Sequence, residues 1–488
     1  MRLSEIVARL RGRAPSLGDT VLLALPAAVI ACHPLANNDL PMHLAIGDWI
    51  LAEGRIPHLD PFSFNGNGEP WVPHEWLAGV LFSGIQRLGG AAGLVAAAVG
   101  LAALVAGAQR ATAARLGVTR GAHLLWGIPL WLLAGRRLML RPHLIALGLP
   151  FLLWWLLLAG RGRPRLLWGA PLILLLWANV HASFPLGIAI VAAELLLPAT
   201  GRAASLTTRA AVLMLCLAAL LLTPHGVEHL LLPLRLGADP VFMEAIQEWA
   251  SPVGGGEHSA AFRHTPVFAL SIPWILLTLP ALFRRRSRLP LSYRLFALAT
   301  LVLYLRHQRY LALLALATLP LLPCTGWSPR AVSARALPRL ATLLASLLLL
   351  YPGYPVTWRS QRPAGGGWSP TLPIEQVRIL HREWKTRGPV LCEYEYGGTV
   401  AWASRGELQP SMDSRNRVYG AEIFREHENA LDRDDEERRR LLDLAAAAII
   451  HHPQRDPWRR ELAGQLDIDP TWRRIAISPW FLVYVRNR

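Results

Sequence analysis

An aspartate, Asp39, follows directly after the first long apolar block and begins the stretch DLPMHLAIG. Proline is tolerated in the first turn of a helix, so Pro41 is compatible with a helix that begins near Asp39 and places His43 one turn further on. A carboxylate there can take a proton from a hydroxyl or an amine, which makes Asp39 a candidate general base. The alternative is that Asp39 caps the helix, and both roles can coexist, because helix N-terminal N–H groups keep a carboxylate ionised.

Arginines gather in two short turns of an otherwise apolar sequence. One turn contains Arg136, Arg137 and Arg141, and the other contains Arg306 and Arg309, whose spacing predicts a shared helix face. Guanidinium groups hold phosphate oxygens through a planar fork of donors, so these side chains are candidates for binding a phosphate. The alternative for each arginine is that it extends from a helix end to the lipid headgroups.

Further polar side chains at the ends of apolar blocks are candidates for lining the same cavity. Either Glu75 or Glu248 would add a second carboxylate if it folded near Asp39. Packing against neighbours is the alternative for a lone histidine, and hydrogen bonding between helices is the alternative for polar residues at helix ends. The candidate substrate-binding residues in this group are His43, Glu75, Asn179, His181 and Glu248.

A carboxylate and phosphate-binding arginines at a membrane surface suggest transfer of a sugar from a polyprenyl-phosphate donor. The leaving phosphate needs positive charge most in the transition state, and the carboxylate would accept the proton of a glycan, lipid or protein acceptor. Two other classes stay open: a transporter or flippase of a lipid-linked or anionic substrate, and a membrane-anchored scaffold. Transporters often contain two repeated halves, whereas this sequence shows no internal repeat.

Composition indicates the elements that must position these residues. Of the 488 residues, 53% are hydrophobic and 17% are charged, and the mean hydropathy is +0.30; soluble domains usually carry about 25% charged residues. The apolar residues run in blocks that predict a polytopic α-helical membrane bundle of about eleven helices. The blocks are 19–36, 77–108, 121–135, 143–159, 166–184, 185–198, 209–223, 266–283, 289–305, 310–323 and 338–355.

The basic residues predict how this bundle is oriented. The formal net charge is +17, but no groove-reading motif accompanies it, so nucleic acid is not expected as a partner. The N-terminal arginines and the runs 161–165 and 284–288 fall on one side of the alternating path, and the positive-inside rule makes that side cytosolic. The N-terminus is then cytosolic, and the arginines near Arg137 and Arg309 lie on the outer side.

The sequence predicts two domains. Residues 1–358 form the membrane domain, with a first outer loop at 37–76 and a long outer loop at 224–265, and residues 359–488 form an α/β domain on the outer side. Helices are expected near 373–386 and 420–444, and strands near 389–394, 399–403, 445–451, 474–477 and 480–486. Asp413 and Arg415 in this domain either contact substrate or form an internal ion pair.

The order of these parts resembles the GT-C class of integral-membrane glycosyltransferases, in which a catalytic acid follows the first span, as Asp39 does. The first loop, Asp39-x3-His43-x3-Gly47 with Asp60-Pro61-Phe62-Ser63 and Trp71-x2-His74-Glu75-Trp76, is similar to a largely uncharacterised bacterial family with GT-C-like features. Further similar segments are Glu248-Trp249-x-Ser251-Pro252, Arg306-x2-Arg309-Tyr310, and Tyr396-Gly397-Gly398 through Asp413-x-Arg415. The resemblance implies a multi-pass protein of the bacterial cytoplasmic membrane whose donor is a polyprenyl-phosphate sugar.

The sequence departs from the GT-C pattern at the second acid. Many enzymes of that class carry two neighbouring acids, but Asp39 is flanked by Asn38 and Leu40. A divalent metal is therefore not indicated, and no cofactor is expected. The four cysteines are far apart and predict neither a disulfide framework nor a zinc site.

Overall fold

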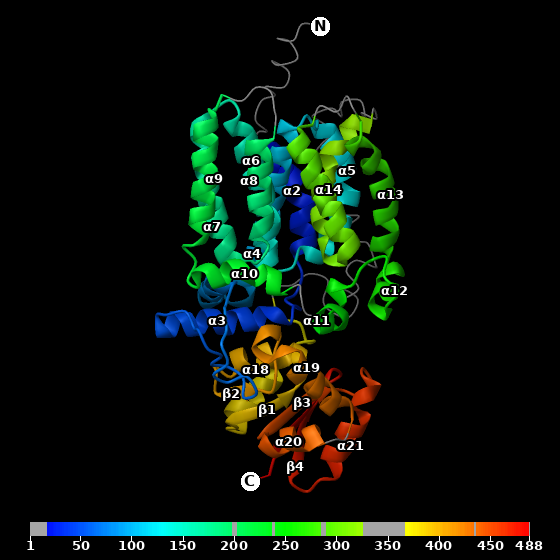
Figure 1. Ribbon diagram of the computed structural model, residues 1–488. Helices are drawn as coiled ribbons and strands as arrows, with labels where there is room; N and C mark the ends of the chain where they lie inside the picture. Colours follow the sequence, from blue (N-terminus) through cyan, green and yellow to red (C-terminus); the bar gives the residue numbers. More distant parts are fainter. Residues whose placement is uncertain are drawn as a thin grey trace. The chain divides into compact units, whose positions relative to one another are not determined.

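The computed structural model describes residues 17–197, 203–236, 240–284, 289–325, 367–433 and 436–487 (Figure 1). By their internal contacts these residues form two compact units. The first contains residues 17–33 and 95–325, and the second contains residues 34–94 and 367–487. The first outer loop thus packs with the C-terminal domain, and the domain boundary predicted at residue 358 lies outside the described residues.

The first unit is helical, and helices lie in each predicted apolar block except 338–355, which lies outside the described residues. Three further helices, Gly226–Leu236, Pro240–Ala245 and Glu257–Arg263, lie in the stretch 224–265 that was predicted as a long outer loop. Thr119, Ser205 and Thr265 each accept a hydrogen bond from the backbone N–H three residues further on, which fixes the start of a helix. The elements are α2 (Leu17–Ala31), α4 (Trp76–Arg115, shared with the second unit), α5 (Arg120–Ala134), η1 (Gly135–Arg137), α6 (Pro142–Gly160), η2 (Pro164–Gly169), α7 (Ala170–Val180), α8 (Phe184–Leu196), α9 (Leu206–Leu220), α10 (Gly226–Leu236), α11 (Pro240–Ala245), η3 (Gln247–Trp249), α12 (Glu257–Arg263), α13 (Pro266–Leu282), α14 (Leu291–Arg306), η4 (Gln308–Tyr310), α15 (Leu311–Thr318) and η5 (Leu319–Thr325).

Aromatic side chains form the centre of this unit. The Trp154 ring on α6 lies 4.9 Å from the Tyr293 ring and 5.7 Å from the Phe296 ring of α14, measured between centroids. All three side chains are buried. Aromatic pairs at such distances stabilise a core beyond the apolar area that they bury, so they fix α6 against α14.

Length and composition mark only some of these helices as clear membrane spans. Among the described residues, α4 and α6 are long and apolar enough to cross a bilayer, and α12 with α13 makes a third span if this pair, bent by 75°, is counted as one. The predicted number of about eleven spans is therefore not confirmed. The surface nevertheless carries large apolar side chains such as Leu104, Leu172 and Leu276, each at least 67% exposed, as expected where lipid covers a helix.

The second unit contains a five-stranded sheet of order β2-β1-β3-β5-β4 (Figure 1). Strand β1 pairs in parallel with β2 and β3, whereas β5 pairs antiparallel with β3 and β4. Successive side chains point to opposite faces, so Val390 and Leu391 enter separate apolar clusters. The strands are β1 (Gly388–Cys392), β2 (Leu408–Pro410), β3 (Ala447–His451), β4 (Trp472–Ile477) and β5 (Phe481–Arg486).

Helices surround this sheet, and one of them corrects a prediction. Residues 399–403 are not a strand but lie in a short helix, because Gly397 and Gly398 bring its first turn against neighbouring backbone. A Cβ added at Gly397 would lie 1.9 Å from the Met412 carbonyl oxygen. The elements are α3 (Asp39–Glu53), the first part of α4, α17 (Ile374–Arg378), the π-helical turn η7 (Ile379–Glu383), η8 (Tyr394–Tyr396), α18 (Gly397–Ala403), α19 (Asn416–Asp432), α20 (Glu436–Leu444), η9 (Pro457–Arg459) and α21 (Arg460–Ile468).

Glycines allow α3 to approach two neighbouring helices closely. A Cβ added at Gly47 would lie 2.1 Å from the Gly79 carbonyl oxygen on α4, and one at Gly398 of α18 would lie 2.8 Å from the Met42 nitrogen. Gly90, with φ of 58°, then breaks α4 at a point where a side chain would be strained. The glycines of the first-loop and C-terminal motifs therefore hold α3 in a fixed position within this unit.

Candidate functional site

Asp39 is the first residue of α3, and its backbone N–H donates to the Asn37 Oδ1 atom at 2.9 Å. The N-cap position belongs to Asn38, whose side chain makes no capping hydrogen bond. Asp39 is therefore a first-turn residue rather than the cap. An acid in the first turn interacts favourably with the positive end of the helix dipole.

His43 and Glu75 lie side by side in this unit. The His43 Nε2 atom is 3.5 Å from the nearer Glu75 carboxylate oxygen, and the His43 side chain is mostly buried. His74 also approaches Glu75, at 3.9 Å. Burial lowers the pKa of His74, a hydrogen bond from the ring to the Val72 backbone opposes this effect, and the nearby Arg417 charge adds to it, so that the pKa is about 4. The first-loop motif thus brings a carboxylate one helical turn from Asp39.

A second carboxylate near Asp39 comes from the C-terminal domain. The Asn38 Nδ2 atom donates to Glu395 at 2.9 Å, and Glu395 belongs to η8, directly after β1. Glu395 is exposed at the surface, but desolvation by the neighbouring chain raises the pKa of its carboxyl; His451 opposes this rise, and the negative charges of Glu393 and Asp39 add to it. Glu395 is not among the predicted site residues, because it is far from Asp39 along the chain. Its place at the end of a predicted strand was the available signal, because polar side chains at the carboxyl ends of parallel strands often form sites.

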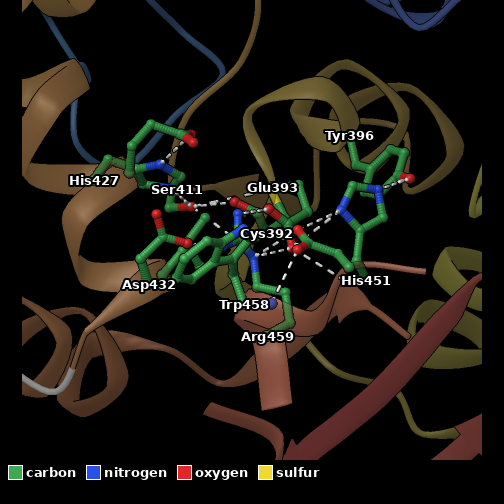
Figure 2. Close-up of polar contacts among 12 residues, drawn as sticks. Cys392, Glu393, Tyr396, Ser411, His427, Asp432, His451, Trp458 and Arg459 are labelled. Atoms are coloured by element: carbon green, nitrogen blue, oxygen red, sulfur yellow. Dashed lines mark hydrogen bonds and ion pairs between the residues drawn. The ribbon is translucent and has the colours of Figure 1, made fainter. Parts of the chain in front are cut away.

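Figure 2 shows the polar groups that meet at this carboxyl edge of the sheet. Glu393 follows β1 and accepts two hydrogen bonds at 2.8 Å from the guanidinium of Arg459. His451 ends β3, and its Nε2 atom shares a hydrogen bond of 2.5 Å with the Tyr396 hydroxyl. Burial would raise the pKa of Glu393, but Arg459 and His451 hold the pKa below its ordinary value. Glu393 is therefore an ionised structural partner of Arg459.

A serine and a histidine also meet at this edge (Figure 2). Ser411 Oγ lies 2.9 Å from His427 Nε2, which is the spacing of a nucleophile and its base. Both residues are buried, however, and Ser411 accepts a hydrogen bond from the Cys392 backbone nitrogen. The serine therefore links the chain after β2 to β1, and its burial does not favour a nucleophilic role.

Asp413 and Arg415 form an internal ion pair, which confirms the structural alternative. Arg415 donates to both Asp413 oxygens, at 2.8 and 2.6 Å, and to Asp60 at 2.5 Å. Its guanidinium lies 5.0 Å from the Phe62 ring and 4.7 Å from the Trp71 ring. The Asp60-Pro61-Phe62-Ser63 motif thus holds the first outer loop against the C-terminal domain.

In the first unit, three of the predicted arginines converge on one carboxylate. Glu248 lies 2.7 Å from Arg137 Nη1, 3.5 Å from Arg141 Nη1 and 3.3 Å from Arg309 Nη1. These side chains come from the chain around η1, from η3 and from η4, so the tertiary fold brings together three separate polar turns. We call Arg137, Arg141, Arg309 and Glu248 the arginine cluster.

Short backbone contacts hold the arginine cluster in place. The Arg137 guanidinium donates to the Arg309 carbonyl at 3.3 Å, and the Arg137 carbonyl pairs with His143 at 2.9 Å. The Arg309 guanidinium lies 4.2 Å from the Trp249 ring. Stacking and fixed hydrogen bonds reduce the motion of long side chains, so the guanidinium groups are preorganised for an anion.

Electrostatics keep the cluster fully charged at neutral pH. Burial would raise the pKa of the Glu248 carboxyl, but Arg137, Arg309 and Arg141 hold the pKa well below its ordinary value. Burial lowers the pKa of Arg137, Glu248 opposes this effect, and the neighbouring arginines add to it, so that the pKa is about 10. The cluster therefore carries three positive charges and one negative charge.

The other predicted residues of the first unit lie outside the arginine cluster. Arg136 and Arg306 are both exposed. Arg306 and Arg309 do not share a helix face, because α14 ends at Arg306 and the backbone is extended at His307 before η4 begins. A shared face would require the helix to continue from Arg306 to Arg309, so this prediction was wrong.

Asn179 and His181 lie at the end of α7. Asn179 donates to the Leu175 carbonyl of its own helix at 2.8 Å, and the His181 ring contacts the Ser183 hydroxyl at 2.8 Å. Such local hydrogen bonds are typical of polar residues at the end of a helix. A substrate contact for either residue stays a prediction.

Comparisons with solved structures then test the resemblance at the level of the fold. The Archaeoglobus fulgidus oligosaccharyltransferase, tethered to an acceptor peptide, is 13% identical with a TM-score of 0.55, over 90% of this chain and 69% of that chain. ArnT from Cupriavidus metallidurans, bound to undecaprenyl phosphate, is 15% identical with a TM-score of 0.57, over 99% and 98%. The mycobacterial arabinofuranosyltransferase AftD is 14% identical with a TM-score of 0.50, over 96% and 40%.

The chain has the fold of the GT-C membrane glycosyltransferases. No family model and no curated protein matches the sequence. The GT-C fold confirms the resemblance inferred from the order of the motifs. It extends over almost the whole length of ArnT, so both units belong to the shared architecture.

The described residues contain no group of three or more histidine, cysteine, aspartate or glutamate side chains that could hold a metal ion. The two carboxylates near α3 have different hydrogen-bond or ion-pair partners. Glu395 binds the Asn38 amide, and Glu75 contacts His43.

Proposed function

We propose that the protein transfers a sugar from a polyprenyl-phosphate donor to an acceptor on the outer side of the membrane. The observation that carries this proposal is the arginine cluster, in which three guanidinium groups converge on a single carboxylate. Guanidinium forks bind phosphate and carboxylate with the same geometry. A partly exposed cluster of this kind is suited to the phosphate of a lipid-linked donor.

Asp39 is the proposed general base. Its carboxylate would accept the proton as the acceptor oxygen or nitrogen attacks the anomeric carbon of the donor sugar. The bond between that carbon and the phosphate oxygen breaks, and polyprenyl phosphate leaves with the electron pair. Arg137, Arg141 and Arg309 would stabilise the negative charge that grows on the phosphate, where such charge accelerates the reaction most.

The solved structures support this class of donor and acceptor. ArnT binds undecaprenyl phosphate, and the oligosaccharyltransferase is tethered to an acceptor peptide. We extend to this chain, at this coarse level, a polyprenyl-phosphate carrier from the one and a separate acceptor from the other. The proposed contacts of the substrates are His43, Glu75, Arg136, Asn179, His181 and Arg306 in addition to the arginine cluster.

A sugar-transfer assay on the purified full-length chain in lipid nanodiscs tests the proposal. A panel of radiolabelled polyprenyl-phosphate sugars is offered with a membrane extract as the source of acceptors. Replacing a general base typically costs about 10²–10⁴-fold in rate, so Asp39→Asn should lower transfer by at least about a hundredfold. Asp48→Asn is the matched control, because Asp48 lies on the same helix and pairs with Ser83 and Arg87.

Equal transfer by Asp39→Asn and the wild-type chain would remove Asp39 from the mechanism. Movement of the donor across the bilayer of proteoliposomes, with the sugar still attached, would replace the proposal with the transporter alternative. Loss of transfer in Asp39→Asn with an unchanged unfolding midpoint supports the catalytic role.

A further inference from the structure

Glu248 occupies the position where the arginine cluster would hold an anion. One of its carboxylate oxygens lies 2.7 Å from Arg137 and 3.5 Å from Arg141, and the other lies 3.3 Å from Arg309. The two carboxylate oxygens contact three guanidinium groups, and two oxygens of a phosphate would make the same contacts. A phosphate and this carboxylate therefore compete for the same donors.

The exposure of these side chains allows the carboxylate to leave. The Glu248 side chain is 26% exposed, against 13% for Arg137 and 16% for Arg309. A carboxylate that already reaches water loses less on separation than a fully buried one, for which breaking an ion pair is costly. Arg137 and Arg309, in contrast, are more deeply buried, whereas Arg141 is 24% exposed and can follow a bound anion.

The chain around Glu248 is fixed by contacts that do not involve its carboxylate. The Gln308 backbone nitrogen donates to the Ala250 carbonyl at 2.9 Å, and the His307 ring contacts the Trp249 carbonyl at 2.6 Å. The Ser251 hydroxyl donates to the Leu305 carbonyl at 2.7 Å. The segment can therefore keep its place when the carboxylate turns away or is replaced.

We propose that Glu248 is a stand-in for the donor phosphate. Its carboxylate holds Arg137, Arg141 and Arg309 together while the site is empty, yields them when the phosphate binds, and returns as the product leaves. This inference rests on the proposed function, since it assumes that the arginine cluster binds the phosphate of a lipid-linked donor. It adds a role for a residue that otherwise only weakens the positive charge of the site.

Charge explains why such a residue is useful. A sugar phosphodiester carries about one negative charge, and the released polyprenyl phosphate carries about two, because a phosphate monoester has a second pKa near 6. Three arginines without a counter-charge would bind the released product more tightly than the donor. Glu248 repels the extra charge, so it favours release of polyprenyl phosphate after transfer.

Binding of undecaprenyl phosphate to the full-length chain in nanodiscs tests this role. Removing a competing negative charge should strengthen binding, so Glu248→Gln should bind undecaprenyl phosphate about tenfold more tightly than the wild-type chain. Product inhibition of sugar transfer should increase by a similar factor. Glu257→Gln is the matched control, because Glu257 is an exposed acid at the start of α12 in the same outer loop and should leave binding unchanged.

The direction of the change decides between the two roles of Glu248. A purely structural carboxylate would give equal or weaker binding in Glu248→Gln, and that result overturns the inference. A wild-type chain that binds no undecaprenyl phosphate, with no change in Arg309→Ala, overturns the phosphate site and the proposed function with it. Wild-type binding that Arg309→Ala weakens, without a gain in Glu248→Gln, leaves the proposed function standing and removes only the stand-in role. Thermal unfolding of each variant identifies any loss of binding that comes from misfolding.

Discussion

The side-chain amide of Asn38 donates to the carboxylate of Glu395 at 2.9 Å, although these two residues are 357 positions apart in the chain. The contact joins the residue before Asp39 to the carboxyl end of β1 in the C-terminal domain. It brings a second carboxylate close enough to Asp39 for the two negative charges to interact. The C-terminal domain therefore supplies part of the surroundings of Asp39.

Replacing Glu395 should slow sugar transfer without weakening donor binding. Glu395→Gln removes a carboxyl group beside Asp39 and changes the charge around the proposed base, so we expect about a tenfold fall in kcat. Glu395→Asp should restore part of the rate. The acidic limb of the pH–rate profile should also move, because Glu395 has a raised pKa and faces Asp39, Glu393, Glu428 and His451.

The control for this prediction is Glu375→Gln, since Glu375 is an exposed acid of α17 whose partner is Arg378. Binding of undecaprenyl phosphate should be the same in Glu395→Gln and the wild-type chain. An unchanged kcat and pH profile in Glu395→Gln would show that the Asn38 contact serves only to dock the C-terminal domain.

Replacing Arg415 should destabilise the second unit strongly. Arg415 is 6% exposed and pairs with Asp60 and Asp413, both fully buried. Removing one partner of a buried ion pair leaves uncompensated charge and typically costs about 3–5 kcal/mol. Arg415→Met should lower the unfolding midpoint accordingly, whereas Arg387→Met, at an exposed pair with Glu407, should cost less than about 1 kcal/mol. Similar midpoints for the two variants would contradict the structural role of the network.

Two glycines of the C-terminal domain should respond in opposite directions to alanine. In Gly398→Ala the new Cβ would lie 2.7 Å from the Met42 Cβ and 2.8 Å from its nitrogen, so α18 must move away from α3. Overpacking of this kind costs about 1–3 kcal/mol. Gly464 lies inside α21 with nothing within 4 Å of the added Cβ, so Gly464→Ala should stabilise by about 0.5–1 kcal/mol. Equal unfolding midpoints would show that α18 does not depend on its close approach to α3.

The sequence predicted the local elements well because their signals are local. Apolar blocks and the caps Thr119, Ser205 and Thr265 set the helices of the first unit. The β-forming side chains of residues 399–403 predict a strand, because the packing partners of the two preceding glycines are distant and give no local signal. Arg306 and Arg309 were placed on one helix face, because the end of α14 at Arg306 has no strong sequence signal.

The partners of the candidate site residues depend on tertiary structure and could not be predicted. Glu248 was expected to help bind substrate, and only the fold showed that Arg137, Arg141 and Arg309 converge on it. Glu395 was missed because the contact with Asn38 closes a very long loop. The residue types near the ends of apolar blocks therefore predicted the chemistry of the candidate site. The contacts between those residues could be known only from the folded chain.

Acidification should destabilise the protein in part through His74. The ordinary histidine pKa is near 6.5, and burial lowers the pKa of His74 to about 4 in the folded chain. Between these two values the unfolded chain binds a proton that the folded chain excludes, so stability falls as the pH decreases from 6.5 toward 4. At pH 5 the free energy of unfolding is lower by about 1–2 kcal/mol from this effect. Above pH 7 the effect is negligible, because the histidine is then neutral in both states. Unfolding midpoints measured at pH 7.5 and pH 5 should therefore differ less in His74→Gln than in the wild-type chain. An equal difference in both proteins would show that His74 does not contribute to the acid sensitivity.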